Sequence, residues 1–126
     1  MKFMDLDVWL RAMDLVVDVY SATDSLPRRE QFGLKTQICR AVVSVVSNIA
    51  EGEGRASRRD HAKFLVTARA SLYEVMTQIV ICERLGYLNP EVTGVLREKI
   101  VRVCQLINGT LRYVKRRAAR EARPAT

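Results

Sequence analysis

The chain is 126 residues long, is 48% apolar by residue type and carries a formal net charge of +7. This length and apolar content allow one domain with a substantial core and exclude a disordered chain. The positive charge favours a polyanionic partner, with nucleic acid ahead of an anionic membrane surface.

Neither the N-terminus nor the cysteines indicate export or a membrane. No stretch approaches about 18 uninterrupted apolar residues, so we expect no membrane span. The segment MKFMDLDVWL lacks the apolar core of a secretion signal. Cys39, Cys82 and Cys104 are odd in number and form no CxxC pattern. We therefore expect reduced thiols in a cytoplasmic protein.

The first expected helix spans residues 7–23. Asp7 is suited to cap it, because a carboxylate accepts hydrogen bonds from the free N–H groups of a helix start. The helix ends at DSLPRRE, where Leu26 precedes Pro27 and is pushed out of helical geometry. Helical spacing predicts an apolar face from Trp9, Met13, Val16, Val17 and Tyr20.

The second expected helix spans residues 29–51 and contains the run AVVSVVSNIA. The β-branched residues suit a strand, but the apolar positions repeat with a period near three, which indicates a helix. Its apolar face is Val42, Val43, Val45, Val46, Ile49 and Ala50, and its polar face is Gln37, Arg40, Ser44, Ser47, Asn48 and Glu51. Gly52 is expected to end the helix in a left-handed conformation.

Two more helices follow, with clear start and stop signals. Ser57 and Asp60 resemble a capping box for a helix that runs to about Leu85. Gly86 stops that helix, Asn89 caps the next one and Pro90 takes its first position. The last helix is expected to fray after about residue 119, and a basic tail begins at about residue 115. Four long helices with short connections predict an all-α, up-down-up-down antiparallel four-helix bundle, as a single domain over residues 1–126.

Two basic stretches are candidate contacts for a polyanion. RASRRDHAK holds four basic residues at a helix start, and residues 112–123 hold six basic residues and one acid. In an antiparallel bundle these stretches lie at the same end and can join. The alternative is that these cations are only solvated. The candidate nucleic-acid-binding residues are Arg55, Arg58, Arg59, Lys63, Arg112, Lys115, Arg116 and Arg117.

The stretch SNIAEG is interpreted as a packing motif, made of Ser47, Asn48, Glu51 and Gly52. Small polar residues let another helix approach closely, and Glu51 is placed to accept from Arg55 or from a neighbouring chain. A catalytic role is disfavoured because no partner histidine, cysteine or metal set accompanies Asn48 and Glu51. The GEG sequence lacks the strand and the GK[ST] of a phosphate loop. His61 is the only histidine, so we expect no metal site, no cofactor and no small-molecule substrate.

Several segments, in this order, resemble one bacterial family: DLDVW, FGL, SNIAEG, GRAS, FL…A…SLYE and RLGYL. The chain is similar to the four-helix-bundle proteins of the 23S ribosomal RNA intervening-sequence (S23) family, over about residues 3–114. The resemblance implies a ring-like homopentamer with no enzymatic activity. It also implies an arrangement similar to the basic, nucleic-acid-binding pentamer of diversity-generating retroelements. Glu53 stands where the family often has an aromatic residue, which favours phosphate contact over base stacking.

These observations predict a non-enzymatic oligomeric bundle that binds RNA or DNA non-specifically through its basic patches. The alternative is a protein–protein interaction scaffold with no nucleic-acid ligand, in which the charge only keeps the protein in solution.

Overall fold

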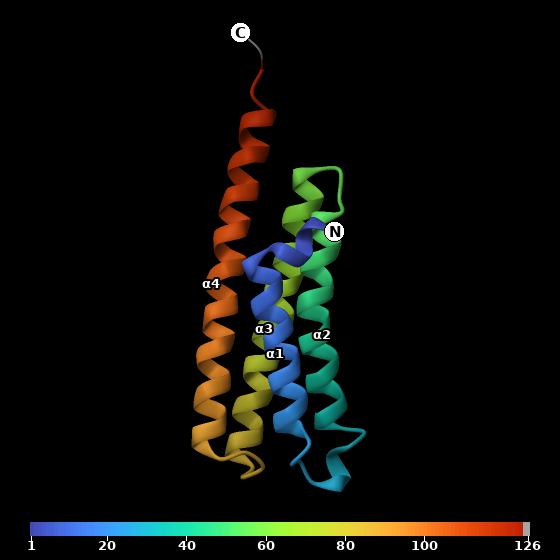
Figure 1. Cartoon of the computed structure of the whole chain (residues 1–126), viewed down its shortest axis with the longest axis vertical. Helices are drawn as coiled ribbons and strands as arrows, with labels where there is room; N and C mark the ends of the chain where they lie inside the picture. Colours follow the sequence, from blue (N-terminus) through green and yellow to red (C-terminus); the bar gives the residue numbers. More distant parts are fainter. Residues whose placement is uncertain (125–126) are drawn as a thin grey trace.

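The computed structural model describes residues 1–124, and this part of the chain is helical and contains no strand. Its elements are a 3₁₀ turn η1 (Lys2–Asp5), α1 (Asp7–Thr23), a 3₁₀ turn η2 (Arg28–Glu30), α2 (Leu34–Glu53), α3 (Arg58–Arg84) and α4 (Pro90–Glu121). Successive helices run antiparallel, and α1 and α3 each pack against both α2 and α4 (Figure 1). The predicted four-helix bundle is confirmed.

The bundle core consists of one apolar stripe from each helix, with residues three or four positions apart. On α3 and α4 the buried stripe includes Leu72, Ile79, Ile100 and Ile107. On α1 the predicted face is wrong, because Val17 and Tyr20 are exposed and Trp9, Met13 and Val16 are only half-buried. The buried α1 stripe is instead Val8, Ala12, Leu15 and Val19.

The turn between α3 and α4 has the predicted capping. Gly86 has a φ of 75°, the left-handed conformation in which glycine carries no steric cost. Asn89 then caps α4, since its Oδ1 accepts from the backbone N–H of Val92 at 2.8 Å. Pro90 is the first residue of α4. At the start of α1 the prediction fails: Asp7 is the first helical residue, makes no cap, and pairs with Arg11 at 3.3 Å.

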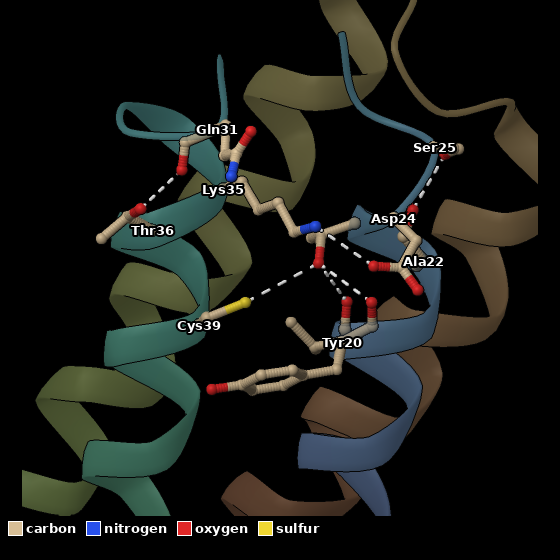
Figure 2. A network of polar contacts seen from close by, with 10 residues as sticks. Tyr20, Ala22, Asp24, Ser25, Gln31, Lys35, Thr36 and Cys39 are labelled. Atoms are coloured by element: carbon tan, nitrogen blue, oxygen red, sulfur yellow. Dashed lines mark hydrogen bonds and ion pairs between the residues drawn. The ribbon is translucent and has the colours of Figure 1, made fainter. Parts of the chain in front are cut away.

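The second helix begins later than predicted, at Leu34 instead of Arg29. Pro27 starts a separate 3₁₀ turn, and Gly33, with φ −110° and ψ −108°, interrupts helical geometry before α2. Across this junction Lys35 donates to the Asp24 carboxylate at 3.1 Å, and Thr36 donates to the Gln31 carbonyl at 2.6 Å (Figure 2). The first contact joins the end of α1 to the start of α2, and the second holds the segment after η2 against the first turn of α2.

The last helix is the longest, with 32 residues, and spans about 48 Å at 1.5 Å per residue. It continues to Glu121, so residues 115–121 are helical and the predicted fraying at residue 119 is not observed. The end of α4 extends beyond the corner that joins α2 to α3 (Figure 1). By length and composition alone, α3 is the one described helix that could cross a membrane, at a mean hydropathy of 1.2. Its apolar stripe packs in the bundle core, and the absence of a span stays a prediction.

Candidate nucleic-acid interface

The two basic stretches meet at the end of the bundle that holds the start of α3 and the end of α4. There a groove of about 870 Å³ has four cations along it, Arg58, Arg59 and Lys63 from α3 and Lys115 from α4. Its other lining residues are mostly small and apolar: Ala62, Val66, Thr67, Ala118 and Ala122. We call this surface the basic groove. It joins cations that are about 50 residues apart in the sequence.

The first turn of α3 concentrates positive potential beside this groove. Ser57 caps the helix by accepting the backbone N–H of Asp60 on its Oγ at 3.0 Å, as predicted. The backbone N–H groups of Arg58 and Arg59 have no hydrogen-bond partner among the described residues, as is usual at a helix start. Free N–H groups, the helix dipole and two arginine side chains together make this end of α3 attractive to anions.

The remaining predicted cations lie outside the groove. Arg55 is held by the protein itself, with its Cζ 4.5 Å from the Phe64 ring centroid and its Nη2 3.8 Å from Glu51. Arg112 and Arg116 are exposed on α4, and Arg117 lies over the Tyr113 ring at 5.9 Å. The structure therefore gathers four of the eight predicted residues into the groove.

Glu121 and His61 also lie at this end, although neither was among the predicted binding residues. The Arg58 Nε donates to Glu121 Oε1 at 3.3 Å, so the only acid in the basic C-terminal run pairs with the helix start. His61 is 8% exposed, and its Nε2 lies 3.4 Å from Glu53 Oε1 without hydrogen-bond geometry. Burial lowers the pKa of His61, the Arg58 charge lowers it further, and the Glu53 carboxylate opposes both.

Gly52 does not end α2 as predicted, but it lies where another helix approaches closely, as expected of a residue in the packing motif. The helix does not end there, because α2 continues to Glu53, and Gly52 does not take a left-handed conformation. A Cβ at position 52 would lie 2.9 Å from His61 Cδ2 and 3.1 Å from Phe64 Cβ. Gly52 is therefore required by the close approach of α3 to α2 at this corner.

The other residues of the packing motif differ in their contacts. Asn48 Nδ2 donates to the Ser44 carbonyl at 2.8 Å and to Ser44 Oγ at 3.1 Å. Ser44 Oγ lies 2.9 Å from Ser71 Oγ on α3, which joins the two helices through small polar side chains. Ser47 is exposed, and Glu51 pairs with Arg55. Residues 1–124 hold no group of three or more His, Cys, Asp or Glu residues placed to bind a metal.

Comparisons with known proteins agree with this architecture. The family described as 23S rRNA-intervening sequence protein matches residues 4–109 of the chain. A crystal structure from Bacteroides thetaiotaomicron VPI-5482, described as a protein with unknown function from the S23 ribosomal protein family, has a similar fold, with a TM-score of 0.75. It is 20% identical in sequence, and the similarity covers 82% of this chain and 97% of that one. No curated protein matches the chain.

Proposed function

The chain belongs to the 23S rRNA-intervening sequence protein family, and on this premise we propose that it binds RNA or DNA without sequence preference. In this proposal the protein is an oligomeric bundle without enzymatic activity. The observation that carries the proposal is the basic groove, where Arg58, Arg59 and Lys63 of α3 meet Lys115 of α4. Nothing in the family description or among the described residues points to catalysis.

The mechanism is contact with phosphates and release of their counterions. None of the described residues that line the groove is aromatic, so the groove has no platform on which bases could stack. Lysine and arginine side chains with apolar surface between them suit a sugar–phosphate backbone, which carries no sequence information. This chemistry does not distinguish RNA from DNA.

Assembly into a homopentamer is part of the same proposal. Apolar side chains remain exposed along α1, at Leu10, Val17 and Tyr20, with exposed fractions of 44%, 65% and 47%. A ring would cover such side chains and present five basic grooves together. Several weak phosphate contacts then act on one strand, and multivalency raises the apparent affinity without any new contact.

A binding assay with a labelled oligonucleotide tests the proposal. At about 50 mM salt we expect saturable binding that is lost at higher salt. The double substitution Arg58→Glu with Arg59→Glu should weaken it strongly. The matched control is Arg28→Glu with Arg84→Glu, which makes the same charge change at exposed positions at the other end of the bundle. Absence of binding at low salt refutes the proposal. An equal loss of affinity in both double variants refutes the basic groove as the binding site.

A protein–protein scaffold is the second candidate. It is favoured by exposed apolar side chains away from the groove, such as Phe32 and Tyr73, which are 90% and 55% exposed. A scaffold would keep its oligomeric state and show no salt-dependent binding of nucleic acid, so the same assay separates the two candidates.

A further inference from the structure

A second, smaller cavity lies at the corner between α2 and α3 and shares only Arg58 with the basic groove. It has a volume of about 290 Å³ and is lined by Glu53, Arg55, Ala56, Ser57, Arg58, His61 and Glu121. We call it the corner pocket. It draws charged groups from α2, from the loop that follows it, from α3 and from α4.

The pocket lies at the N-terminus of a long helix that has unused donors. The 27-residue α3 places the positive end of its dipole here. Ser57 already accepts the N–H groups of Asp60 and His61, on its hydroxyl and carbonyl oxygens. The N–H groups of Arg58 and Arg59 stay free among residues 1–124, beside the Arg58 guanidinium.

His61 lines the same pocket, and one of its ring nitrogens is buried without a hydrogen bond. The Nε2 atom of His61 has no hydrogen bond to any described residue, although the side chain is only 10% exposed. Leaving such an atom unpaired is costly, and it usually marks a site for a ligand, an ion or an unseen water. The imidazole belongs to a pocket that also holds two arginines, and its Nε2 lies 3.4 Å from Glu53 Oε1 without hydrogen-bond geometry, so a ligand there would compete with Glu53 for this nitrogen.

An anion from the chain itself already pairs with Arg58 in this pocket. The Glu121 carboxylate accepts from Arg58 Nε at 3.3 Å and comes from the last turn of α4. This turn is at the end of the helix, where the backbone opens at little cost in free energy. The carboxylate can therefore leave Arg58 without disturbing the core.

We propose that the corner pocket binds a single phosphate monoester or inorganic phosphate, which replaces the Glu121 carboxylate at Arg58. A monoester or a free phosphate presents at least three unesterified oxygens, and the pocket offers three sets of donors: the Arg58 guanidinium, the free N–H groups of α3 and the His61 imidazole. An internal phosphodiester has only two such oxygens. With Glu121 displaced, Arg55 and Arg58 outnumber Glu53 in the pocket.

The inference deepens the proposed function, since a strand of RNA or DNA carries such a group at a phosphorylated end. Inorganic phosphate tests the pocket independently of any strand. His61 is the only histidine in the chain, so its imidazole NMR signals report on the pocket without assignment of other residues. We expect a saturable shift with added phosphate, together with a rise in the pKa of His61, and no shift with sodium chloride at equal ionic strength.

Substitution of Glu121 provides a gain of binding that misfolding cannot imitate. Glu121→Gln should lower the dissociation constant for phosphate about tenfold, the effect of removing one charged competitor. The matched control is Glu98→Gln on the exposed surface of α4, which makes the same charge change and should leave the constant unchanged. Arg58→Gln should abolish the response while the circular dichroism spectrum stays helical. A response that is absent, or equal in the wild type and Glu121→Gln, overturns the proposal.

Two oligonucleotides of one sequence, with a 5′-phosphate or a 5′-hydroxyl, separate this inference from the proposed function. Tighter binding of the phosphorylated strand, lost in Arg58→Gln, supports the pocket. Equal binding of both strands with no response to inorganic phosphate overturns the pocket and leaves the proposed function standing. A response to inorganic phosphate without binding of either strand supports the pocket and overturns the proposed function.

Discussion

Arg58 Nε lies 3.3 Å from Glu121 Oε1, which joins the first residue of α3 to the last residue of α4 across 63 positions of sequence. The Arg58 side chain is 33% exposed and that of Glu121 is 55% exposed. An ion pair so open to solvent contributes little to stability, so its main effect is local. It holds the last turn of α4 at the corner where α3 begins.

Glu121→Gln is therefore expected to change stability only slightly. The free energy of unfolding in urea should fall by less than about 1 kcal/mol, the usual range for an exposed pair. Hydrogen exchange should speed up in the last turn of α4 and stay unchanged in the α3 core. A loss well above this range would show that the pair supports the bundle as a whole.

Lys63 lines the basic groove and has no ion pair among the described residues, so it isolates one phosphate contact. The logarithm of the binding constant should fall linearly with the logarithm of the salt concentration. Lys63→Ala should reduce the magnitude of this slope by about 1. Oligonucleotide titrations at several salt concentrations measure the slope. Arg84→Ala, at the other end of α3, is the control and should leave the slope unchanged.

Gly52→Ala should destabilise the protein even though alanine favours a helix. The new Cβ would lie 2.9 Å from His61 Cδ2 and 3.1 Å from Phe64 Cβ, so α2 and α3 must separate. Overpacking of this kind costs about 1–3 kcal/mol. Thermal and urea unfolding measure the change.

Gly94→Ala is the matched control, because nothing lies within 4 Å of a Cβ at position 94 in α4. There the better helix propensity of alanine should stabilise the protein by about 0.5–1 kcal/mol. Stabilisation at both positions would contradict the close approach at the corner.

His61 predicts a specific loss of stability in mild acid. Burial holds the pKa of His61 below its ordinary value of 6.5, so the folded protein binds this proton less readily than the unfolded chain. The stabilising contribution is complete above pH 6.5 and falls as the pH drops from there to the lower folded pKa. Urea unfolding across this range should show the loss, and His61→Gln should remove it. An NMR titration that gives His61 a pKa above 6.5 would contradict this sign.

The helices and most of their ends could be predicted because their signals are local. Ser57, Gly86 and Asn89 act through their own backbone neighbours, so their roles follow from the sequence around them. The buried face of α1 could not be predicted in this way. Helical spacing is shared by the buried stripe and by the neighbouring face that was predicted. The buried stripe is Val8, Ala12, Leu15 and Val19. Only packing against α2 and α4 decides between the two faces.

The positive charge of the candidate site could be predicted from the sequence, but the contacts between its residues could not. The antiparallel topology brings the basic start of α3 beside the basic end of α4, as expected from the helix order. The partners of Gly52 and Glu121 lie on other helices, at His61 and Phe64 for Gly52 and at Arg58 for Glu121, and no local pattern identifies them. One feature of the sequence distinguished Glu121, which is the only acid in the basic run from Arg112 to Arg123.

The exposed apolar side chains on α1 locate the interface of the proposed oligomer. Val17 is 65% exposed, although valine in a monomer is usually covered. Val17→Glu places a charge in the proposed interface, and desolvating that charge should dissociate the assembly. Light scattering should give the wild type about five times the chain mass of 14.3 kDa and give Val17→Glu a smaller mass. Val101→Glu on α4, where the valine is 47% exposed, is the control. A monomeric wild type refutes the ring, and equal dissociation of both variants refutes the assignment of the interface to α1.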